Sequence, residues 1–556
     1  MCFASEGIDV RKDVSGWITR LNDAMIDNYT ASGAWRNESI ADIAARLVIE
    51  KPDMLAFIEG DRSLYLGNLV TKARKIAAVL ATRGLVPGDV VSFQLPNWLE
   101  TAVINLACCI GGFVCNPIIP IYREAEVGYI LRDGRAKILF VPTSFRGFDY
   151  VNMARALQAG LPDLATIVTV RGEAEGCLGY EELLASNAPD VASGHPDPNA
   201  VKLLLYTSGT TSHPKGVLHS HNSLMAELLA ARDYWGLGAS DVVLMPSPVT
   251  HITGYLYALE MGFVTGCAAV LMERWDASEA VELIKRHGVT MSVGATPFLR
   301  ELTDTVVSAG ALLPTMRLFI CGGAPVAPEL VRRAAQAIPG CAISRAFGSS
   351  EAPTVTLGVR GVEELELGAT TDGRIVNNEV RIIDEATGAL LGEGAEGEIL
   401  VRGPEVMLGY TDQALTDDAF DQDGFFRTGD LGRIEFGDFL AVSGRKKDVI
   451  VRGGENISPQ EIEDALHRYP AITDVAVVAM PHERLGEGVC AYVIADAPVS
   501  VADIGSFLGE QGLARQKWPE RVEMVDAFPR TASGKVQKNI LRDRLVAQAQ
   551  PTEASL

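Results

Sequence analysis

Short continuous apolar runs alternate with apolar residues at helical spacing through the first part of the chain. Residues 41–51 and 69–84 have the helical spacing, and residues 90–95, 136–141 and 201–205 are runs typical of buried strands. Strands that alternate with helices form mostly parallel sheets with helices on both faces. The pattern therefore predicts an α/β fold for this part of the chain.

The alternation continues beyond residue 220 and then changes. Strands are predicted at residues 242–245, 268–271, 291–293, 318–321 and 343–347, and helices from about residue 220, at 255–263 and at 277–287. From residue 373 the pattern becomes short alternating strands at 374–384, 397–403 and 432–442, separated by Gly, Asp and Glu turns. This change predicts a small antiparallel subdomain.

A charged segment at residues 444–448 precedes a last unit, with helices predicted at 459–469 and 501–510 and strands at 475–480 and 489–494. We therefore predict a large N-terminal domain at residues 1–444, a hinge at 445–447, a small α+β domain at 448–546 and a solvated tail at 547–556.

Composition narrows the class of protein. With 556 residues, 47% hydrophobic and 22% charged, the chain is typical of a soluble globular protein of at least two domains. A net charge of −22 argues against nucleic-acid binding, which needs a basic surface. The most apolar window, residues 101–120, is interrupted by Asn and Pro, so no integral membrane span is predicted. Nine scattered cysteines and the lack of a signal peptide indicate the cytoplasm. Monomer and homodimer both stay open.

Residues 206–221 are the most distinctive stretch, Tyr-Thr-Ser-Gly-Thr-Thr-Ser-His-Pro-Lys-Gly-Val-Leu-His-Ser-His. Lying between a predicted strand and a predicted helix, this loop can cradle a phosphate through glycine backbone, hydroxyl donors and a lysine charge. The candidate phosphate-binding residues are Thr207, Ser208, Gly209, Thr210, Thr211 and Lys215. A flexible Ser/Thr/Gly connector is the alternative.

This loop resembles the signature loop of the adenylate-forming superfamily, which includes acyl-CoA synthetases, luciferases and peptide-synthetase adenylation domains. The resemblance covers residues 50 to 546, and five motifs occur in the family's order. Ser212 departs from the family, which most often has glycine there. The loop lacks the Walker GxxxxGK[ST] spacing, which disfavours a kinase or ATPase. The resemblance implies ATP as a co-substrate and a mobile C-terminal domain.

The turn at residues 347–351 resembles the family's adenine- and metal-binding turn. The resemblance implies that Glu351, with Thr207, helps to hold Mg²⁺, a cation that takes oxygen ligands. Phe347 stands where tyrosine is commoner, so it keeps a stacking face for adenine. The candidate nucleotide-binding residues of this turn are Phe347, Gly348, Ser349 and Ser350.

Three later stretches extend the resemblance before its last motif. Arg-Thr-Gly-Asp-Leu at residues 427–431 resembles the ribose-binding motif, which implies that Asp430 accepts from the ribose hydroxyls and that Arg445 also reaches the ribose. Lys447 falls at the family's hinge residue. Gly453 and Gly454 resemble the loop that lines the pantetheine path of coenzyme A.

The last motif, Pro-Arg-Thr-Ala-Ser-Gly-Lys, ends at Lys535. Joining a carboxylate to the α-phosphate brings two anions together, and a lysine ammonium that bridges them stabilises the transition state. The resemblance therefore implies that Lys535 is catalytic in the first half-reaction.

The acid pocket is expected, by position in the family, to use residues that are apolar, aromatic or small. These are Trp235, His251, Tyr255, Thr296, Cys321, Gly322, Gly323 and Gly348, with Gly323 and Ala324 also at the nucleotide. His251 is expected near the carboxylate as a gate or contact. Because a second substrate charge would be buried unpaired, a monocarboxylic acid with an apolar body is predicted.

Together these features predict an AMP-forming carboxylate–CoA ligase, similar to medium-chain fatty acid and cyclohexanecarboxylate-type ligases. Medium-chain, alicyclic and arylalkanoic acids stay open as substrates. A peptide-synthetase adenylation domain should carry an aspartate within residues 247–254, which has none, and a carrier domain is expected to be absent. A stand-alone enzyme that loads an amino or aryl acid onto a carrier protein is the main alternative. A luciferase-type oxygenase shares the motifs, and a non-enzymatic binding protein should have lost Lys535 or Glu351.

Overall fold

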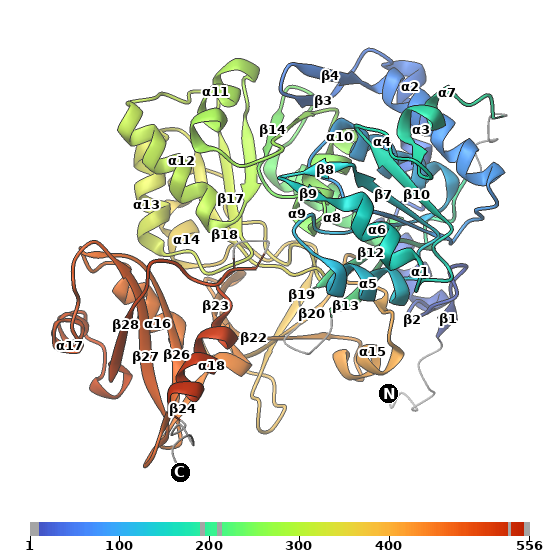
Figure 1. Ribbon diagram of the computed structural model, residues 1–556. Coiled ribbons are helices and arrows are strands. Elements are labelled where there is room, and N and C mark those ends of the chain that lie inside the picture. Colours follow the sequence, from blue (N-terminus) through green and yellow to red (C-terminus); the bar gives the residue numbers. More distant parts are fainter. Residues whose placement is uncertain (1–9, 189–194, 208–213, 532–534, 550–556) are drawn as a thin grey trace, which may run out of the picture.

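The computed structural model describes residues 10–188, 195–207, 214–531 and 535–549. The structure contains two large sheets, a small antiparallel sheet and a C-terminal α+β unit (Figure 1). The α/β class predicted from the alternating pattern is confirmed. No helix among these residues is both long and apolar enough to cross a membrane.

The first large sheet is parallel over most of its width. Its strands, in spatial order, are β11 (Leu178–Gly179), β10 (Thr166–Val170), β7 (Ile138–Pro142), β5 (Val90–Phe93), β6 (Val114–Pro117), β12 (Val201–Thr207), β13 (Lys215–Ser220) and β21 (Gly409–Tyr410). The last two join antiparallel to their neighbours. The outer face packs on α5 (Glu124–Asp133) and α6 (Tyr150–Gln158).

The second large sheet combines strands from distant parts of the sequence. Its order is β18 (Ala342–Ala346), β17 (Leu318–Gly322), β16 (Met291–Gly294), β14 (Val242–Met245), β15 (Ala268–Leu271), β3 (Leu55–Glu59) and β4 (Arg62–Tyr65). On its outer side lie α11 (Ala277–His287), α12 (Thr296–Ala309) and α13 (Pro328–Ala337).

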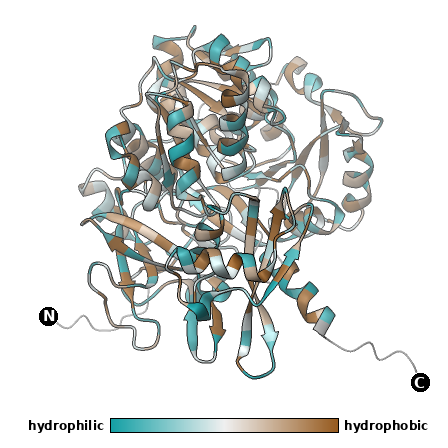
Figure 2. Cartoon of the chain, turned by 90° about the vertical axis from the view of Figure 1, so that its left-hand side faces the viewer, coloured by the Kyte–Doolittle hydropathy of each residue, from teal (hydrophilic) through white to brown (hydrophobic). Residues whose placement is uncertain are grey.

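One continuous apolar core joins the inner faces of both sheets. It contains residues of α2 (Ile40–Glu50), α3 (Leu66–Thr82), α4 (Leu99–Gly111), α8 (His221–Trp235) and α10 (Met261–Thr265). In Figure 2 the central strands are largely hydrophobic, whereas many helices at the periphery carry both hydrophobic and hydrophilic segments. The two sheets are therefore joined through one core, and ligand sites of open α/β sheets form at the carboxyl ends of their parallel strands.

The antiparallel subdomain and the C-terminal unit follow. The subdomain contains β19 (Glu379–Ile383), β20 (Gly397–Arg402), β22 (Phe426–Glu435) and β23 (Phe439–Arg445). The C-terminal unit contains β24 (Ile450–Arg452), β25 (Glu455–Ile457), α16 (Pro459–Leu466), β26 (Ile472–His482), β27 (Gly486–Ala495), α17 (Val501–Glu510), β28 (Arg521–Met524) and α18 (Lys538–Ala549).

The structure corrects the predicted strand–loop–helix order around the phosphate loop. The chain leaves β12, returns antiparallel as β13, and only then enters α8, whose N-cap is Ser220. Thr207 and Lys215 are therefore paired at the ends of two antiparallel strands, and the whole of β13 separates Lys215 from the start of α8. Apolar Val217 and Leu218 made this stretch look like an approach to the helix, but both are buried strand residues.

Three further boundaries differ from prediction. The helix predicted at 255–263 contains a π-helical segment, η1 (Tyr255–Glu260), in which buried Glu260 pairs with buried Lys202. The ribose motif lies within β22 rather than before a strand. Residues 547–549, assigned to the tail, continue α18, which packs on β26 through buried residues such as Leu545.

Candidate active site

The phosphate hairpin brings one candidate residue from each of its strands together. Thr207 ends β12 directly opposite Lys215, the first residue of β13. The Lys215 ammonium lies 5.3 Å from the ring centroid of Tyr410 on the neighbouring strand β21. Ser208, Gly209, Thr210 and Thr211 lie outside the described residues.

Tyr410 links this hairpin to the predicted metal ligand. Its hydroxyl donates to Oε1 of Glu351 at 3.0 Å, and burial, together with the Glu351 charge, raises the pKa of Tyr410. The sequence analysis did not identify Tyr410. Its only local signal is the short apolar run at residues 406–410, since its partners are 59 positions earlier in the chain or on another strand.

The turn that carries Glu351 is fixed from two sides. His219 Nε2 donates to the Ser350 carbonyl at 2.7 Å, and burial lowers the pKa of His219 to about 4, so this histidine is neutral. A Cβ on Gly348 would lie 2.0 Å from the Pro353 carbonyl oxygen, so only glycine fits there. Phe347 follows β18 and donates its N–H to Thr356 at 2.8 Å. Ser349 closes the turn by donating its N–H to the Ala352 carbonyl at 2.8 Å.

Asp430 and Arg445 face each other across β22 and β23. They are register partners, and Arg445 Nε lies 2.9 Å from Asp430 Oδ1. Burial raises the pKa of Asp430, while the charges of Arg445 and Lys535 oppose that effect. The pair therefore presents a largely buried carboxylate next to a half-exposed guanidinium.

Lys535 enters this group from the C-terminal unit. Its Cε would lie 4.0 Å from a Cβ placed on Gly323, which has a φ of +82° after β17. Burial and Arg445 lower the pKa of Lys535 to about 8, against the opposing charges of Asp430 and Glu351. The Lys535 ammonium therefore interacts with two acids from different sheets, Asp430 on β22 and Glu351 after β18.

Lys447 and His251 lie at the edges of the same group. Burial and Arg445 lower the pKa of Lys447, which lies in the short helix η3 (Lys446–Asp448). Burial, with a smaller contribution from Lys535, lowers the pKa of His251 to about 4, so its imidazole is neutral at pH 7. Six predicted site residues from five separate segments thus lie around Lys535: His251, Gly323, Glu351, Asp430, Arg445 and Lys447.

The loop that presents His251 is anchored by a residue that sequence reasoning missed. Asn97, after β5 of the first sheet, donates to the Ser247 carbonyl at 2.9 Å and accepts from Val249 N–H at 2.8 Å. These bonds join a loop of one sheet to the loop that follows β14 of the other. No local pattern marks Asn97, because its partners lie 150 residues away.

The predicted acid-binding side chains are already hydrogen-bonded within the protein. Trp235 Nε1 donates to the Leu357 carbonyl at 2.8 Å, and Tyr255 donates to Asn105 at 2.6 Å. Thr296 donates to the Pro325 carbonyl at 3.1 Å. Cys321 is fully buried at the end of β17, where Gly322, Gly323 and Ala324 follow, and burial raises its thiol pKa to about 12.

Two predicted residues lie apart from the group. Gly453 and Gly454 form the two-residue turn between β24 and β25, both with positive φ, as a tight hairpin requires. Figure 1 shows β24 at the far end of the C-terminal unit, away from β17 and β18.

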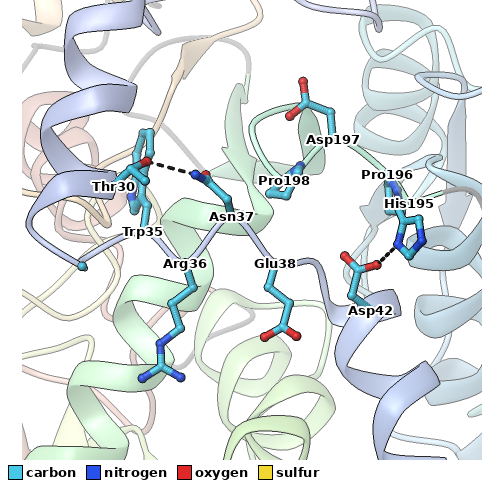
Figure 3. Close-up of a pocket in the computed structure, with 11 residues that line it drawn as sticks. Thr30, Trp35, Arg36, Asn37, Glu38, Asp42, His195, Pro196, Asp197 and Pro198 are labelled. Atoms are coloured by element: carbon cyan, nitrogen blue, oxygen red, sulfur yellow. Dashed lines mark hydrogen bonds and ion pairs between the residues drawn. The ribbon is translucent and has the colours of Figure 1, made fainter.

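A cavity of about 900 Å³ also lies outside the group (Figure 3). It is bordered by residues 30–42 and 195–198, and within it the His195 ring contacts the Asp42 carboxylate through a hydrogen bond. None of the predicted site residues borders it.

A hydroxyl and a lysine at the open end of a hairpin, an acid–arginine pair and a buried lysine of the C-terminal unit are the groups expected of a nucleotide-dependent, adenylate-forming class of enzyme. Comparison with family models agrees: residues 45–411 match the AMP-binding enzyme model, and residues 461–535 match the AMP-binding enzyme C-terminal domain. The chain therefore belongs to the AMP-binding enzyme family, within the superfamily of ATP-dependent adenylate-forming ligases.

Relatives extend over almost the whole chain. The medium-chain fatty-acid–CoA ligase of Escherichia coli is 35% identical and covers 92% of each chain. The 2,3-dihydroxybenzoate-AMP ligase of Bacillus subtilis is 31% identical, covering 94% of this chain and 96% of its own. The ATP-bound crystal structure of MatB from Rhodopseudomonas palustris is 30% identical with a TM-score of 0.80, covering 91% of this chain and 98% of that one.

Proposed function

We propose that this protein is an AMP-forming ligase that joins an apolar monocarboxylic acid to coenzyme A. The observation that carries the proposal is the convergence of Lys535 on Gly323, Glu351 and the Asp430–Arg445 pair. Gly323 and Glu351 belong to the first matched family domain, Lys535 ends the second, and Asp430 and Arg445 lie between them, so the nucleotide and the catalytic lysine meet only when the two domains are together.

In the first half-reaction a carboxylate oxygen of the acid attacks the α-phosphorus of ATP. The bond to the β-phosphate breaks, pyrophosphate leaves, and an acyl-adenylate forms. Lys535 lies next to Gly323 and interacts electrostatically with Asp430 and Arg445, so its ammonium can offset the repulsion of the two anions. Asp430 accepts from the ribose, and Lys215 with Thr207 contacts the phosphates.

Mg²⁺ fits the residues present, because Glu351 and Thr207 supply oxygen ligands and the nucleotide supplies phosphate oxygens. When bound, the ion would neutralise charge on the phosphates. The Tyr410 hydroxyl orients the Glu351 carboxylate toward the hairpin by donating to one of its two oxygens.

In the second half-reaction the thiol sulfur of coenzyme A attacks the acyl carbon, the bond to AMP breaks, and the thiol proton passes to solvent. Gly453 and Gly454 lie away from Lys535 in this domain arrangement. We therefore include a rotation of residues 448–549 about Lys447, which would bring this glycine turn to the site in place of Lys535.

An apolar acid is favoured because the polar atoms of Trp235, Tyr255 and Thr296 already have protein partners. These residues offer aromatic and aliphatic surface rather than free donors. Neutral His251 supplies no cation for a second carboxylate, which would be costly to bury unpaired. Medium-chain, alicyclic and arylalkanoic acids satisfy these conditions.

Adenylation of an aryl acid for transfer to a carrier protein is the second candidate, supported by the relative named 2,3-dihydroxybenzoate-AMP ligase. Purified protein should be assayed with ATP, Mg²⁺ and CoA against fatty, alicyclic, aryl, amino and dicarboxylic acids. Acyl-CoA formed from one apolar class supports the proposal. Pyrophosphate release with a hydroxyaryl or amino acid and no thioester would replace it with the second candidate.

A further inference from the structure

One arginine of the N-terminal domain contacts the C-terminal domain beside the loop that ends in Lys535. Arg300 lies on α12, one turn after Thr296. Its Nη1 donates to the Thr473 carbonyl at 3.0 Å and lies 3.7 Å from Asp474 Oδ2. Both acceptors belong to β26 of the C-terminal unit, which lies below α12 and α13 in Figure 1.

A β-bulge explains why the Thr473 carbonyl is available. The β26–β27 register runs from Ile472 opposite Ala495 to Asp474 opposite Ile494, so Thr473 is the extra residue. Its hydroxyl donates to the Ile494 carbonyl at 2.9 Å, which holds the bulge. A bulge redirects the backbone out of the sheet's hydrogen-bond ladder, here toward Arg300.

Asp474 extends the contact to the catalytic loop. The same Oδ2 that faces Arg300 pairs with Arg530, and Arg530 bridges to Val536 across the loop that ends in Lys535. Thr531 N–H donates to the Lys535 carbonyl at 2.8 Å. Two ion pairs and the backbone pairing of Arg530 and Thr531 with Val536 and Lys535 therefore connect Arg300 to Lys535.

The contact is partly shielded but reversible. Arg300 is 28% exposed and Asp474 15%. Burial lowers the pKa of nearby His467 to about 4, so this histidine is neutral and does not compete for Asp474. Ion pairs of this kind contribute modestly, enough to bias an equilibrium between domain orientations without locking it.

We propose that Arg300 is a positioning residue for the adenylation half-reaction, which it serves by holding the C-terminal domain where Lys535 reaches the nucleotide. The inference rests on the proposed function. Arg300 itself does not contact substrate. Only the domain orientation that places Lys535 at the nucleotide is expected to depend on the Arg300 side chain.

The test compares Arg300→Ala and Arg300→Lys with a matched control, Arg333→Ala. Arg333 on α13 pairs with Asp304 at 2.9 Å, and both belong to the N-terminal domain. Each half-reaction is measured separately: acid-dependent ATP–pyrophosphate exchange without CoA, and thioester formation from synthetic acyl-adenylate plus CoA. Small-angle X-ray scattering gives the radius of gyration independently of activity.

Arg300→Ala is expected to lower the exchange rate by roughly fivefold to tenfold with thioester formation unchanged or faster, while Arg300→Lys recovers part of the loss. Its radius of gyration should exceed that of Arg333→Ala. Equal losses in both half-reactions, or exchange equal to the control, would overturn the proposal. If the wild-type protein makes no adenylate from any acid, the proposed function itself fails. An unchanged radius of gyration in Arg300→Ala would separately refute the role of the Arg300 contact in domain orientation.

Discussion

Raising the pH should slow the adenylation half-reaction by removing the charge of Lys535. Burial and Arg445 lower the pKa of this lysine from 10.5 to about 8, so the ammonium predominates at pH 7 and about a tenth of it remains at pH 9. We therefore expect kcat/KM for adenylation to fall about tenfold between pH 7 and pH 9. An ordinary lysine would lose almost nothing over that range.

The sign of the linkage separates this loss from unfolding. Because the pKa of Lys535 is lower in the folded chain, its charge destabilises the fold below about pH 8, and that cost disappears as the pH rises toward 10.5. Deprotonation of Lys535 therefore stabilises the folded protein while it removes activity. Bound ATP adds negative charge, so the midpoint for kcat should lie at higher pH than the midpoint for kcat/KM.

The assay is acid-dependent ATP–pyrophosphate exchange from pH 6.5 to 9.5, with thermal unfolding recorded at each pH. Lys535→Arg is the matched control, since its charge persists through this range and its profile should be flat. Lys535→Ala should lose about 10²- to 10³-fold at every pH. A wild-type rate that stays level to pH 9.5, or an equal decline in Lys535→Arg, would refute the reasoning.

Three further changes test the site and the core. Gly348→Ala places a methyl group 2.0 Å from the Pro353 carbonyl oxygen and should cost about 1–3 kcal/mol of unfolding free energy, whereas Gly392→Ala, with open space around it, should be near neutral; equal melting temperatures would contradict this. Glu351→Gln keeps a hydrogen-bond acceptor but loses the carboxylate charge, so the Mg²⁺ concentration for half-maximal activity should rise about tenfold; an unchanged Mg²⁺ dependence would exclude Glu351 as a ligand. Burial raises the pKa of Glu227 from 4.5 to about 7, so its stabilising effect on the fold is complete below pH 4.5 and lost as the pH rises through 7. Glu227→Gln should therefore be more stable than wild type above pH 7, by about 2 kcal/mol of unfolding free energy. Unfolding free energies of wild type and Glu227→Gln that change in the same way with pH would count against this.

The sequence predicted elements best where local pattern and burial agree. The helix at Ala277–His287 and the strand at Val242–Met245 were predicted with the observed bounds, because the helix has one clear period and the strand is a continuous apolar run between Asp241 and Pro246. The hairpin after Thr207 was predicted as a loop leading to a helix. The reason is that β13 is buried by contacts with β21, 193 residues later in the register pair Val217–Tyr410, and no local pattern encodes that pairing.

The amino-acid sequence by itself determined the class of this protein, its order of motifs and the chemical types at the site: hydroxyl, carboxylate, guanidinium and ammonium groups in a fixed order. These follow from residue identity, which needs no third dimension. Tertiary structure decided which groups meet. The Tyr410–Glu351 bond, the Asn97 anchor and the Arg300 contact join segments 59 to 173 residues apart. Burial likewise exists only in the fold, and it is burial that gives Lys535 and His251 their lowered pKa values.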